Sequence, residues 1–361
     1  MKNRFLILLS FVLIVGRDVV CANTSMVRER ININRDWRYQ IDDPDGVGAA
    51  LHYSRLKPYL LPCANDFIIF GKRYQRPEGN PGENIAYVKS DFDDSEWRHL
   101  NLPHDWAIEG PFNIDYNGST GKLPYWGIRW YRKTLELSQD DAGKQIYLDI
   151  DGAMSYVSVW CNGQYVGGWP YGYASFRLDL TPYIKAGQKN VLAIRLDNPD
   201  DTSRWYPGSG IYRNVWLVKT SPVHVEQWGT FVRNQQVDSE IAVMEMGVNI
   251  ENHAGKDVQV KLQTSVYLQG KDGRPVGEEV TQSMTKDIAI KKDSWSSARF
   301  QFKVDKPKLW DIDTPNCYVA VSRVFMDGKE MDSYETPFGI RTIEFTHNQG
   351  FMLNGQKVAI K

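Results

Sequence analysis

The stretch Ser155–Trp169, "SYVSVWCNGQYVGGW", places an Asn-Gly pair between two short runs rich in apolar and β-branched residues. Asn-Gly is the preferred pair for a tight type I′ hairpin turn, because both central residues of that turn need positive φ. One strand therefore enters the turn at Asn162-Gly163 and a second strand leaves it. The stretch predicts a β-hairpin.

Similar runs surround this hairpin. In "QIYLDIDG" the residues Ile146, Leu148 and Ile150 share one face, and "FRLDL" and "VLAIRLDN" alternate in the same way. Segments with a helical period are almost absent. Many short strands at regular spacing with turn signals predict a β-sandwich, which we place at residues 26–220.

The pattern changes at Ser221-Pro222. The following strands are longer and polar on one face, as where Val258, Val260 and Leu262 alternate with polar residues. Roughly seven strands over residues 221–337 fit an immunoglobulin-like sandwich. Cysteines and tryptophan at the spacing of an antibody domain are missing, so the prediction concerns the architecture alone.

The last segment, residues 338–361, belongs to neither sandwich by its pattern. Its "GFMLNGQKVAI" repeats the hairpin signal at Asn354-Gly355, and the apolar residues from Val358 onward predict a further strand.

The composition is that of a globular protein of two or three domains, with 361 residues, 42% apolar and 12% aromatic. Twelve Trp and nineteen Tyr fit large β-sheet cores, and they could also supply platforms for sugar rings. Composition does not separate these two uses. A net charge of −1 gives no electrostatic argument for binding nucleic acid or an anionic membrane.

The N-terminus predicts a secretory signal peptide over residues 1–22. Lys2 and Arg4 precede "FLILLSFVLIV", an apolar run too short to span a bilayer, and small residues precede a cleavage point after Ala22. The protein is therefore expected to be secreted or periplasmic, without a transmembrane segment. Two alternatives are a lipoprotein anchored at Cys21 and a buried N-terminal strand.

Cleavage there leaves Cys63, Cys161 and Cys317. An odd number at wide spacing is neither a disulfide framework nor a zinc pattern. We expect buried free thiols, with Cys161 partly exposed beside its turn, and no cofactor in this chain.

Two stretches differ from the alternating strands: "LPHDWAIEGPF", Leu102–Phe112, and "DNPDDTSRWYPGSGIYRNVWL", Asp197–Leu217. Loops rich in Trp, Arg and carboxylates are typical of binding loops. The alternative is that Trp106 and Trp205 pack against a neighbouring domain while the charged residues cap turns.

Catalytic motifs are otherwise scarce. The sequence has no H-E-x-x-H, no G-x-S-x-G and no phosphate-binding glycine loop. A lone His104-Asp105 pair is more often structural than catalytic. Adjacent Asp pairs point to opposite faces of a strand, and Asp140-Asp141 is expected to be a solvated turn.

These stretches, together with "GIRWYRKTLEL", "PKLWDIDTPNCYVAVSRV" and "FGIRTIEFTHNQGFMLNGQKVAIK", occur in the order seen in glycoside hydrolase family 2. The chain resembles the N-terminal part of a β-galactosidase of that family over about residues 30–361. The resemblance implies a jelly-roll sugar-binding domain, an immunoglobulin-like domain, and then a (β/α)8 barrel. Residues 338–361 would be the start of that barrel, truncated at its entrance hairpin.

The same resemblance implies a retaining glycosidase that uses two Glu residues on barrel strands, both beyond Lys361. No catalytic residue is then expected in this chain, which alone should be inactive. Asp105, Arg204, Trp205 and Tyr206 are the expected substrate-binding residues, forming a wall of the pocket for a β-galactoside. Any metal ion, divalent or sodium, is expected in the barrel, and a homo-oligomer is compatible with the family.

Three other interpretations remain open at this point. Inside the family, the enzyme could be a β-mannosidase or a β-glucuronidase. Outside it, the chain could be a stand-alone carbohydrate-binding protein, or a structural module whose loops serve domain or subunit contacts.

Overall fold

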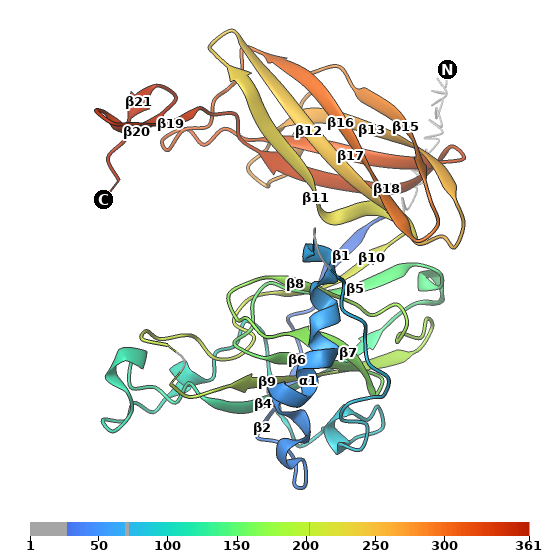
Figure 1. The fold of residues 1–361 in the computed structure, drawn as a ribbon, viewed down its shortest axis with the longest axis vertical. Coiled ribbons are helices and arrows are strands. Elements are labelled where there is room, and N and C mark those ends of the chain that lie inside the picture. Colours follow the sequence, from blue (N-terminus) through green and yellow to red (C-terminus); the bar gives the residue numbers. More distant parts are fainter. Residues whose placement is uncertain (1–26, 69–71, 202, 361) are drawn as a thin grey trace, which may run out of the picture.

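The computed structural model describes residues 27–68, 72–201 and 203–360, which form two β-rich lobes joined end to end (Figure 1). The predicted all-β class with two successive sandwiches is confirmed. The expected signal peptide and Cys21 lie outside the described residues. None of the described helices is long and apolar enough to cross a membrane.

Two sheets make the first lobe. The larger has six strands, which pair in the order β3 (Arg98–Leu100), β2 (Trp37–Ile41), β4 (Gly127–Glu136), β9 (Lys189–Asn198), β6 (Val157–Cys161) and β7 (Gln164–Trp169). The smaller has four, in the order β1 (Glu29–Asn32), β10 (Val215–Thr220), β5 (Gln145–Ile150) and β8 (Phe176–Asp179).

Both faces of the six-stranded sheet are buried. On one face Tyr131, Val159 and Ile194 belong to the core shared with the four-stranded sheet. On the other face Trp130 and Trp160 belong to a second cluster. Side chains alternate between faces along a strand, so β6 is buried at all five positions. This explains why Cys161 is fully buried, contrary to the exposure expected beside its turn.

The second cluster is covered by helical segments that the sequence did not indicate. These are η1 (Gly48–Leu51), α1 (Tyr53–Leu60), η2 (Leu61–Phe67) and η3 (Ala86–Val88). Figure 1 shows α1 lying over the sheet, and its Leu56 and Leu60 are buried there. The helix has eight residues with Pro58 inside, which is too short and too interrupted to show a clear helical period.

The predicted hairpin turn is present between β6 and β7. Asn162 and Gly163 have φ of 51° and 80°, as a type I′ turn requires. The expectation for Asp140-Asp141 was wrong for the second residue. Asp141 is buried and accepts hydrogen bonds from Lys219 Nζ at 2.7 Å and Lys144 Nζ at 3.0 Å. Burial opposes its ionisation, yet these two ammonium groups hold the pKa of Asp141 below its usual range.

The second lobe is also a sandwich of two sheets. One sheet consists of β11 (Val223–Val237), β12 (Ile241–Asn252) and β16 (Ser294–Asp305). The other consists of β14 (Pro275–Val276), β13 (Val258–Gln269), β17 (Tyr318–Met326) and β18 (Lys329–Phe338), with β15 (Met284–Ile290) also paired to β13. Val258, Val260 and Leu262 point into its core, as their alternation predicts.

A small sheet of β19 (Ile343–Thr346), β20 (Gly350–Leu353) and β21 (Gln356–Lys357) follows and projects from this lobe (Figure 1). Its turn residues Asn354 and Gly355 have φ of 51° and 75°. Leu353 at its root is 2% exposed, whereas Phe345 is 74% exposed.

An ion pair made by Arg28, the residue directly before β1, connects the two lobes. Arg28 donates from Nε and Nη2 to the two carboxylate oxygens of Asp332, at 2.9 and 2.7 Å. The Asp332 side chain is fully buried, and it also accepts a hydrogen bond from the Val225 backbone at 2.7 Å. This pair links the start of the first lobe to a strand of the second.

A buried ion pair ties the helical cover to the six-stranded sheet. Asp43 accepts two hydrogen bonds from Arg195, both at 2.8 Å, and a third from Trp130 Nε1 at 2.8 Å. The Arg195 side chain is 1% exposed and that of Asp43 is 14% exposed. The neighbouring Asp42 is 75% exposed and lies 3.6 Å from Arg129.

We predict that Asp43→Ala lowers the free energy of unfolding by about 3–5 kcal/mol, because it leaves a buried guanidinium without its partner. The control, Asp42→Asn, should cost less than about 1 kcal/mol, because the Asp42 carboxylate is exposed to solvent and Asn tolerates the positive φ of 61° found there. Chemical denaturation of the two variants beside the unchanged protein measures both values. Equal losses of unfolding free energy in the two variants would show that the buried Asp43–Arg195 pair stabilises the fold no more than the Asp42 contact does.

Candidate functional site

The two loop stretches singled out in the sequence meet at one end of the first lobe. The backbone N–H of His104 donates to the carbonyl of Ile211 at 2.9 Å, and that of Trp106 donates to Ser209 at 3.0 Å. Gly210 in turn exchanges two backbone hydrogen bonds with Met154, at 2.9 and 3.1 Å. Three segments far apart in sequence are thus held together by their backbones.

Asp105 and Tyr206 form a hydrogen-bonded pair at this end. The Tyr206 hydroxyl donates to Asp105 Oδ2 at 2.7 Å, and Asp105 Oδ1 accepts from the backbone of Ala107 at 3.1 Å. Burial, and then the adjacent carboxylate, raise the pKa of Tyr206 well above its usual value, so the phenol keeps its proton and remains the donor. The carboxylate is partly exposed, which leaves it accessible to a ligand.

His104 points elsewhere and forms no dyad with Asp105. Its Nδ1 lies 2.8 Å from the Tyr131 hydroxyl and its Nε2 lies 3.2 Å from Glu109 Oε1. The ring is buried, and this burial lowers the pKa of His104. His104 and Asp105 therefore have separate hydrogen-bond partners and do not act as a pair.

Exposed aromatic rings flank the pair. Trp205 is 58% exposed and donates from Nε1 to the Tyr173 hydroxyl at 2.9 Å. Tyr173 donates to the Pro207 carbonyl at 3.1 Å, and its ring meets that of Tyr171 edge to face. We call Asp105, Tyr206, Trp205 and Tyr173 the Asp105 wall.

Sequence reasoning missed the two tyrosines of this rim. They lie in "WPYGYASF", where glycine separates two tyrosines directly after a strand, and this is the signal that could have identified them. The structure also separates two predicted tryptophans: Trp106 is buried in the first core, whereas Trp205 is exposed.

Arg204 lies in the same loop, next to Trp205. Its side chain is exposed, and it forms no ion pair with any residue that the structure describes. It therefore offers a cationic group beside the wall. All four predicted site residues lie at one end of the first lobe, with Asp105 and Tyr206 in direct contact.

The arrangement suits a ligand rich in hydroxyl groups. A carboxylate fixed by a phenol and a backbone amide can accept hydrogen bonds from hydroxyls, and exposed indole and phenol rings can cover the C–H face of a ring.

The loop that follows the wall carries three exposed apolar side chains. Ile108, Phe112 and Ile114 are 66%, 76% and 78% exposed. Figure 1 shows this part of the first lobe and the β19–β21 sheet projecting toward the same side of the molecule. Both segments therefore present apolar surface on that side.

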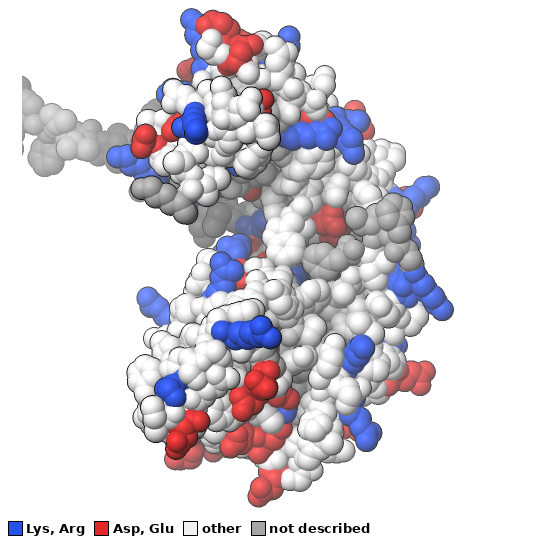
Figure 2. Space-filling view, turned by 60° about the vertical axis from the view of Figure 1, so that its left-hand side comes forward, with Lys and Arg blue, Asp and Glu red and all other residues white. Residues whose placement is uncertain are grey.

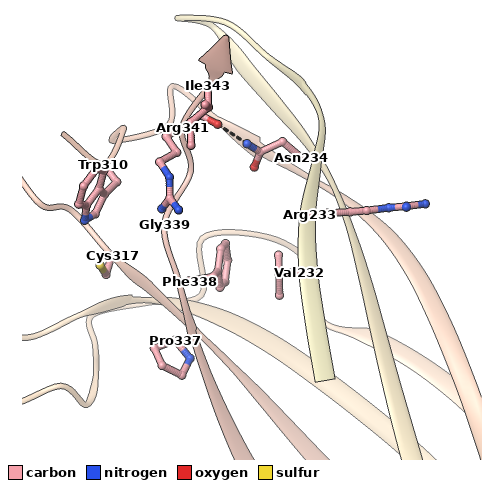
Figure 3. Close-up of a pocket in the computed structure, with 10 residues that line it drawn as sticks. All are labelled: Val232, Arg233, Asn234, Trp310, Cys317, Pro337, Phe338, Gly339, Arg341 and Ile343. Atoms are coloured by element: carbon pink, nitrogen blue, oxygen red, sulfur yellow. Dashed lines mark hydrogen bonds between the residues drawn. The ribbon is translucent and has the colours of Figure 1, made fainter. Parts of the chain in front are cut away.

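A second candidate is an open groove of about 690 Å³ at the root of the β19–β21 sheet (Figure 3). Arg341 stacks over Trp310 at 4.9 Å from the ring centroid, and Asn234 donates to the Arg341 carbonyl. The described residues of its lining include no carboxylate, imidazole or tyrosine, so the groove lacks the groups that most often act in glycoside chemistry.

The charges do not indicate a polyanionic ligand. On the face in Figure 2, Lys and Arg are mixed with Asp and Glu over both lobes, in line with the net charge of −1.

Comparison with known proteins assigns the two lobes. Residues 87–221 match the family model "Glycosyl hydrolases family 2, sugar binding domain", and residues 223–341 match "Glycosyl hydrolases family 2". The beta-galactosidase BoGH2A of Bacteroides ovatus is 40% identical over 345 residues, which are 94% of this chain and 35% of that protein. A putative beta-glucuronidase of Formosa agariphila is 34% identical over 81% of this chain and 28% of that protein.

Solved structures agree. A glycosyl hydrolase family 2 member from Bacteroides cellulosilyticus superposes with a TM-score of 0.75 at 28% identity, over 92% of this chain and 38% of that one. A beta-glycosidase from Bacteroides vulgatus gives a TM-score of 0.69 at 30% identity, over 91% of this chain and 36% of that one. The chain thus spans about a third of the length of the proteins that it matches. It belongs to glycoside hydrolase family 2, of which it contains the sugar-binding domain and the β-sandwich that follows.

Proposed function

We propose that these lobes are the non-catalytic N-terminal region of a retaining β-galactosidase, in which the Asp105 wall forms one side of the sugar pocket. The observation that carries the proposal is the Asp105–Tyr206 pair, which holds a partly exposed carboxylate beside exposed rings. The two catalytic carboxylates that a retaining mechanism needs, about 5–5.5 Å apart, are assigned to a barrel domain outside this chain.

The wall would contribute by orientation. Tyr206 and the Ala107 amide occupy one lone pair on each carboxylate oxygen and leave others for sugar hydroxyls. Trp205 would exclude water from that side, which strengthens the hydrogen bonds made there. Holding the sugar ring in one position lowers the entropic cost of reaching the transition state.

The choice of sugar rests on the relative named a beta-galactosidase, which matches 94% of this chain. One observation favours a β-glucuronidase as the second candidate. A glucuronide carries a carboxylate that needs a cationic partner, and the exposed Arg204 lies two residues from Tyr206.

We predict that the protein made from the complete gene hydrolyses 4-nitrophenyl β-galactoside with a higher kcat/KM than the corresponding β-glucuronide. Arg204→Ala should then change the galactoside value little, because galactose offers no anionic group. A preference for the glucuronide that Arg204→Ala removes would select the second candidate. Turnover of neither substrate would overturn both assignments.

The wall itself is tested by Asp105→Asn in the same full-length protein. An amide oxygen can keep the Ala107 hydrogen bond, so the melting temperature should stay close to that of the unchanged protein. Loss of a charge-assisted hydrogen bond, worth about 1.5–3 kcal/mol, predicts a fall in kcat/KM of about ten- to a hundredfold.

Glu279→Gln is the matched control, since Glu279 also accepts a hydrogen bond from a tyrosine, Tyr267 at 3.2 Å, but lies in the second lobe. It should leave kcat/KM unchanged. If Asp105→Asn likewise has no effect on kcat/KM, Asp105 acts only as a turn cap.

A further inference from the structure

Three potential metal ligands lie together on one face of the second lobe, next to the junction with the first. They are His224 near the start of β11, Glu251 near the end of β12, and His253 two residues later. Their ligand atoms all lie within 4.8 Å of one another. The expectation of no cofactor overlooked them, because 26 positions separate His224 from Glu251 in the sequence.

The backbone places these side chains on the same face. His224 and Glu251 are directly opposite each other in the antiparallel ladder. Such pairs have Cβ atoms about 4.5–5.5 Å apart. Glu251 and His253 are two residues apart and so point the same way, and the His253 N–H extends the ladder by bonding Pro222 O at 2.8 Å. The cluster is thus held by regular strand pairing and does not depend on a mobile loop.

Two of the three ligand-to-ligand distances match those around a tetrahedral ion. His224 Nε2 and His253 Nε2 lie 3.3 and 3.4 Å from the same oxygen, Glu251 Oε2. Zinc bonds of about 2.0–2.1 Å at tetrahedral angles separate ligand atoms by about 3.3 Å. Two imidazoles and one carboxylate, with a fourth position open, are a ligand set that zinc takes.

The hydrogen bonding of His224 also favours a cation. Its Nδ1 lies 2.9 Å from the Ser221 carbonyl, which can only accept, so the hydrogen is on Nδ1. The ring is fully buried. Its Nε2 faces the Glu251 carboxylate oxygen 3.3 Å away. With Nδ1 held by the Ser221 carbonyl, Nε2 is the ring nitrogen left to bind a metal, as is usual for histidine ligands whose other N–H bonds a carbonyl.

The surroundings complete the site. The Tyr147 hydroxyl, from β5 of the first lobe, lies 3.3 Å from His224 Nε2. Glu251 and His253 line a cleft of about 380 Å³ between the lobes, together with Tyr147, Arg177 and Asp179. The exposed edge of the cluster therefore faces this cleft, and its buried edge contacts the first lobe.

We propose that His224, Glu251 and His253 bind one Zn²⁺ ion, with its fourth coordination position facing the cleft between the lobes. The ion stabilises the junction, because it fixes the start of β11 against the end of β12 beside Tyr147. It is separate from the Asp105 wall, whose residues lie on loops of the first lobe.

Zinc binding is measured by isothermal titration of the purified chain with ZnCl₂ after removal of metal with EDTA. We expect one Zn²⁺ per chain and a rise in melting temperature when zinc is added. Mg²⁺ and Ca²⁺ should give neither effect, because these hard cations prefer oxygen ligands to imidazole. Absence of zinc binding would overturn the proposal.

Variants identify the site. His253→Ala and Glu251→Gln should each weaken zinc binding by at least about tenfold and abolish the zinc-dependent rise in melting temperature. His347→Ala, which removes an exposed imidazole from the β19–β21 sheet, is the matched control and should bind zinc normally. His253 is partly exposed, so its substitution leaves the core intact and decides the question even if Glu251→Gln proves unstable.

Zinc binding that persists unchanged in His253→Ala would place the ion elsewhere. In that case protonated His253 forms only an ion pair with the Glu251 carboxylate, without a metal. Stability measured in EDTA checks this directly, because an ion pair without metal predicts the same loss in His253→Ala with and without zinc.

Discussion

Burial of both faces of the six-stranded sheet is the constraint on which the first lobe depends. A strand such as β6, buried at every position, needs cover on two sides. The four-stranded sheet supplies one side, and α1 with its flanking 3₁₀ turns supplies the other. The Asp43–Arg195 pair joins the segment that leads into this helical cover to the sheet, with the Arg195 side chain buried. With both faces occupied, only the ends of the sandwich remain available for binding loops.

The loops at one end are ordered by buried polar groups. Asn198, which is 1% exposed, donates to the carbonyls of Tyr125 at 2.7 Å and Gly208 at 3.2 Å, and accepts from Ser155 at 3.2 Å. A buried amide with partners for donor and acceptor specifies one arrangement of the chains around it, because any other would leave it unsatisfied. Ser209 connects this network to the Asp105 loop, because Asn198 donates to the Ser209 hydroxyl at 3.3 Å and the Trp106 N–H donates to the Ser209 carbonyl at 3.0 Å. The candidate pocket wall is therefore anchored to the buried core, as functional side chains are in sites built on rigid scaffolds.

Local patterns were sufficient for the strands and turns. Each of these patterns involves only a few neighbouring residues, as in the alternation at Val258, Val260 and Leu262 and the Asn-Gly pair at Asn162. Such patterns can therefore be recognised in the sequence alone. Features set by distant partners were not readable. Asp141 looks like a solvated turn until Lys219 is brought onto it, and Cys161 looks accessible until the four-stranded sheet packs against its face. The Asp105–Tyr206 contact spans 101 positions, so the sequence could place both residues on loops without pairing them.

The lobe junction decides whether these local arrangements can act together. Asp332 is fully buried and accepts from Arg28 and from the Val225 amide, and Arg28 also donates to the Val225 carbonyl at 2.7 Å. Breaking such a pair would leave a charge without a partner in a dry environment, so a hinge at this point would be costly. The second lobe is thereby held in one orientation relative to the first. The side on which the β19–β21 sheet projects is then fixed with respect to the Asp105 wall. A pocket wall assists catalysis most when it is in position before the substrate binds, because ordering it during each turnover would cost entropy.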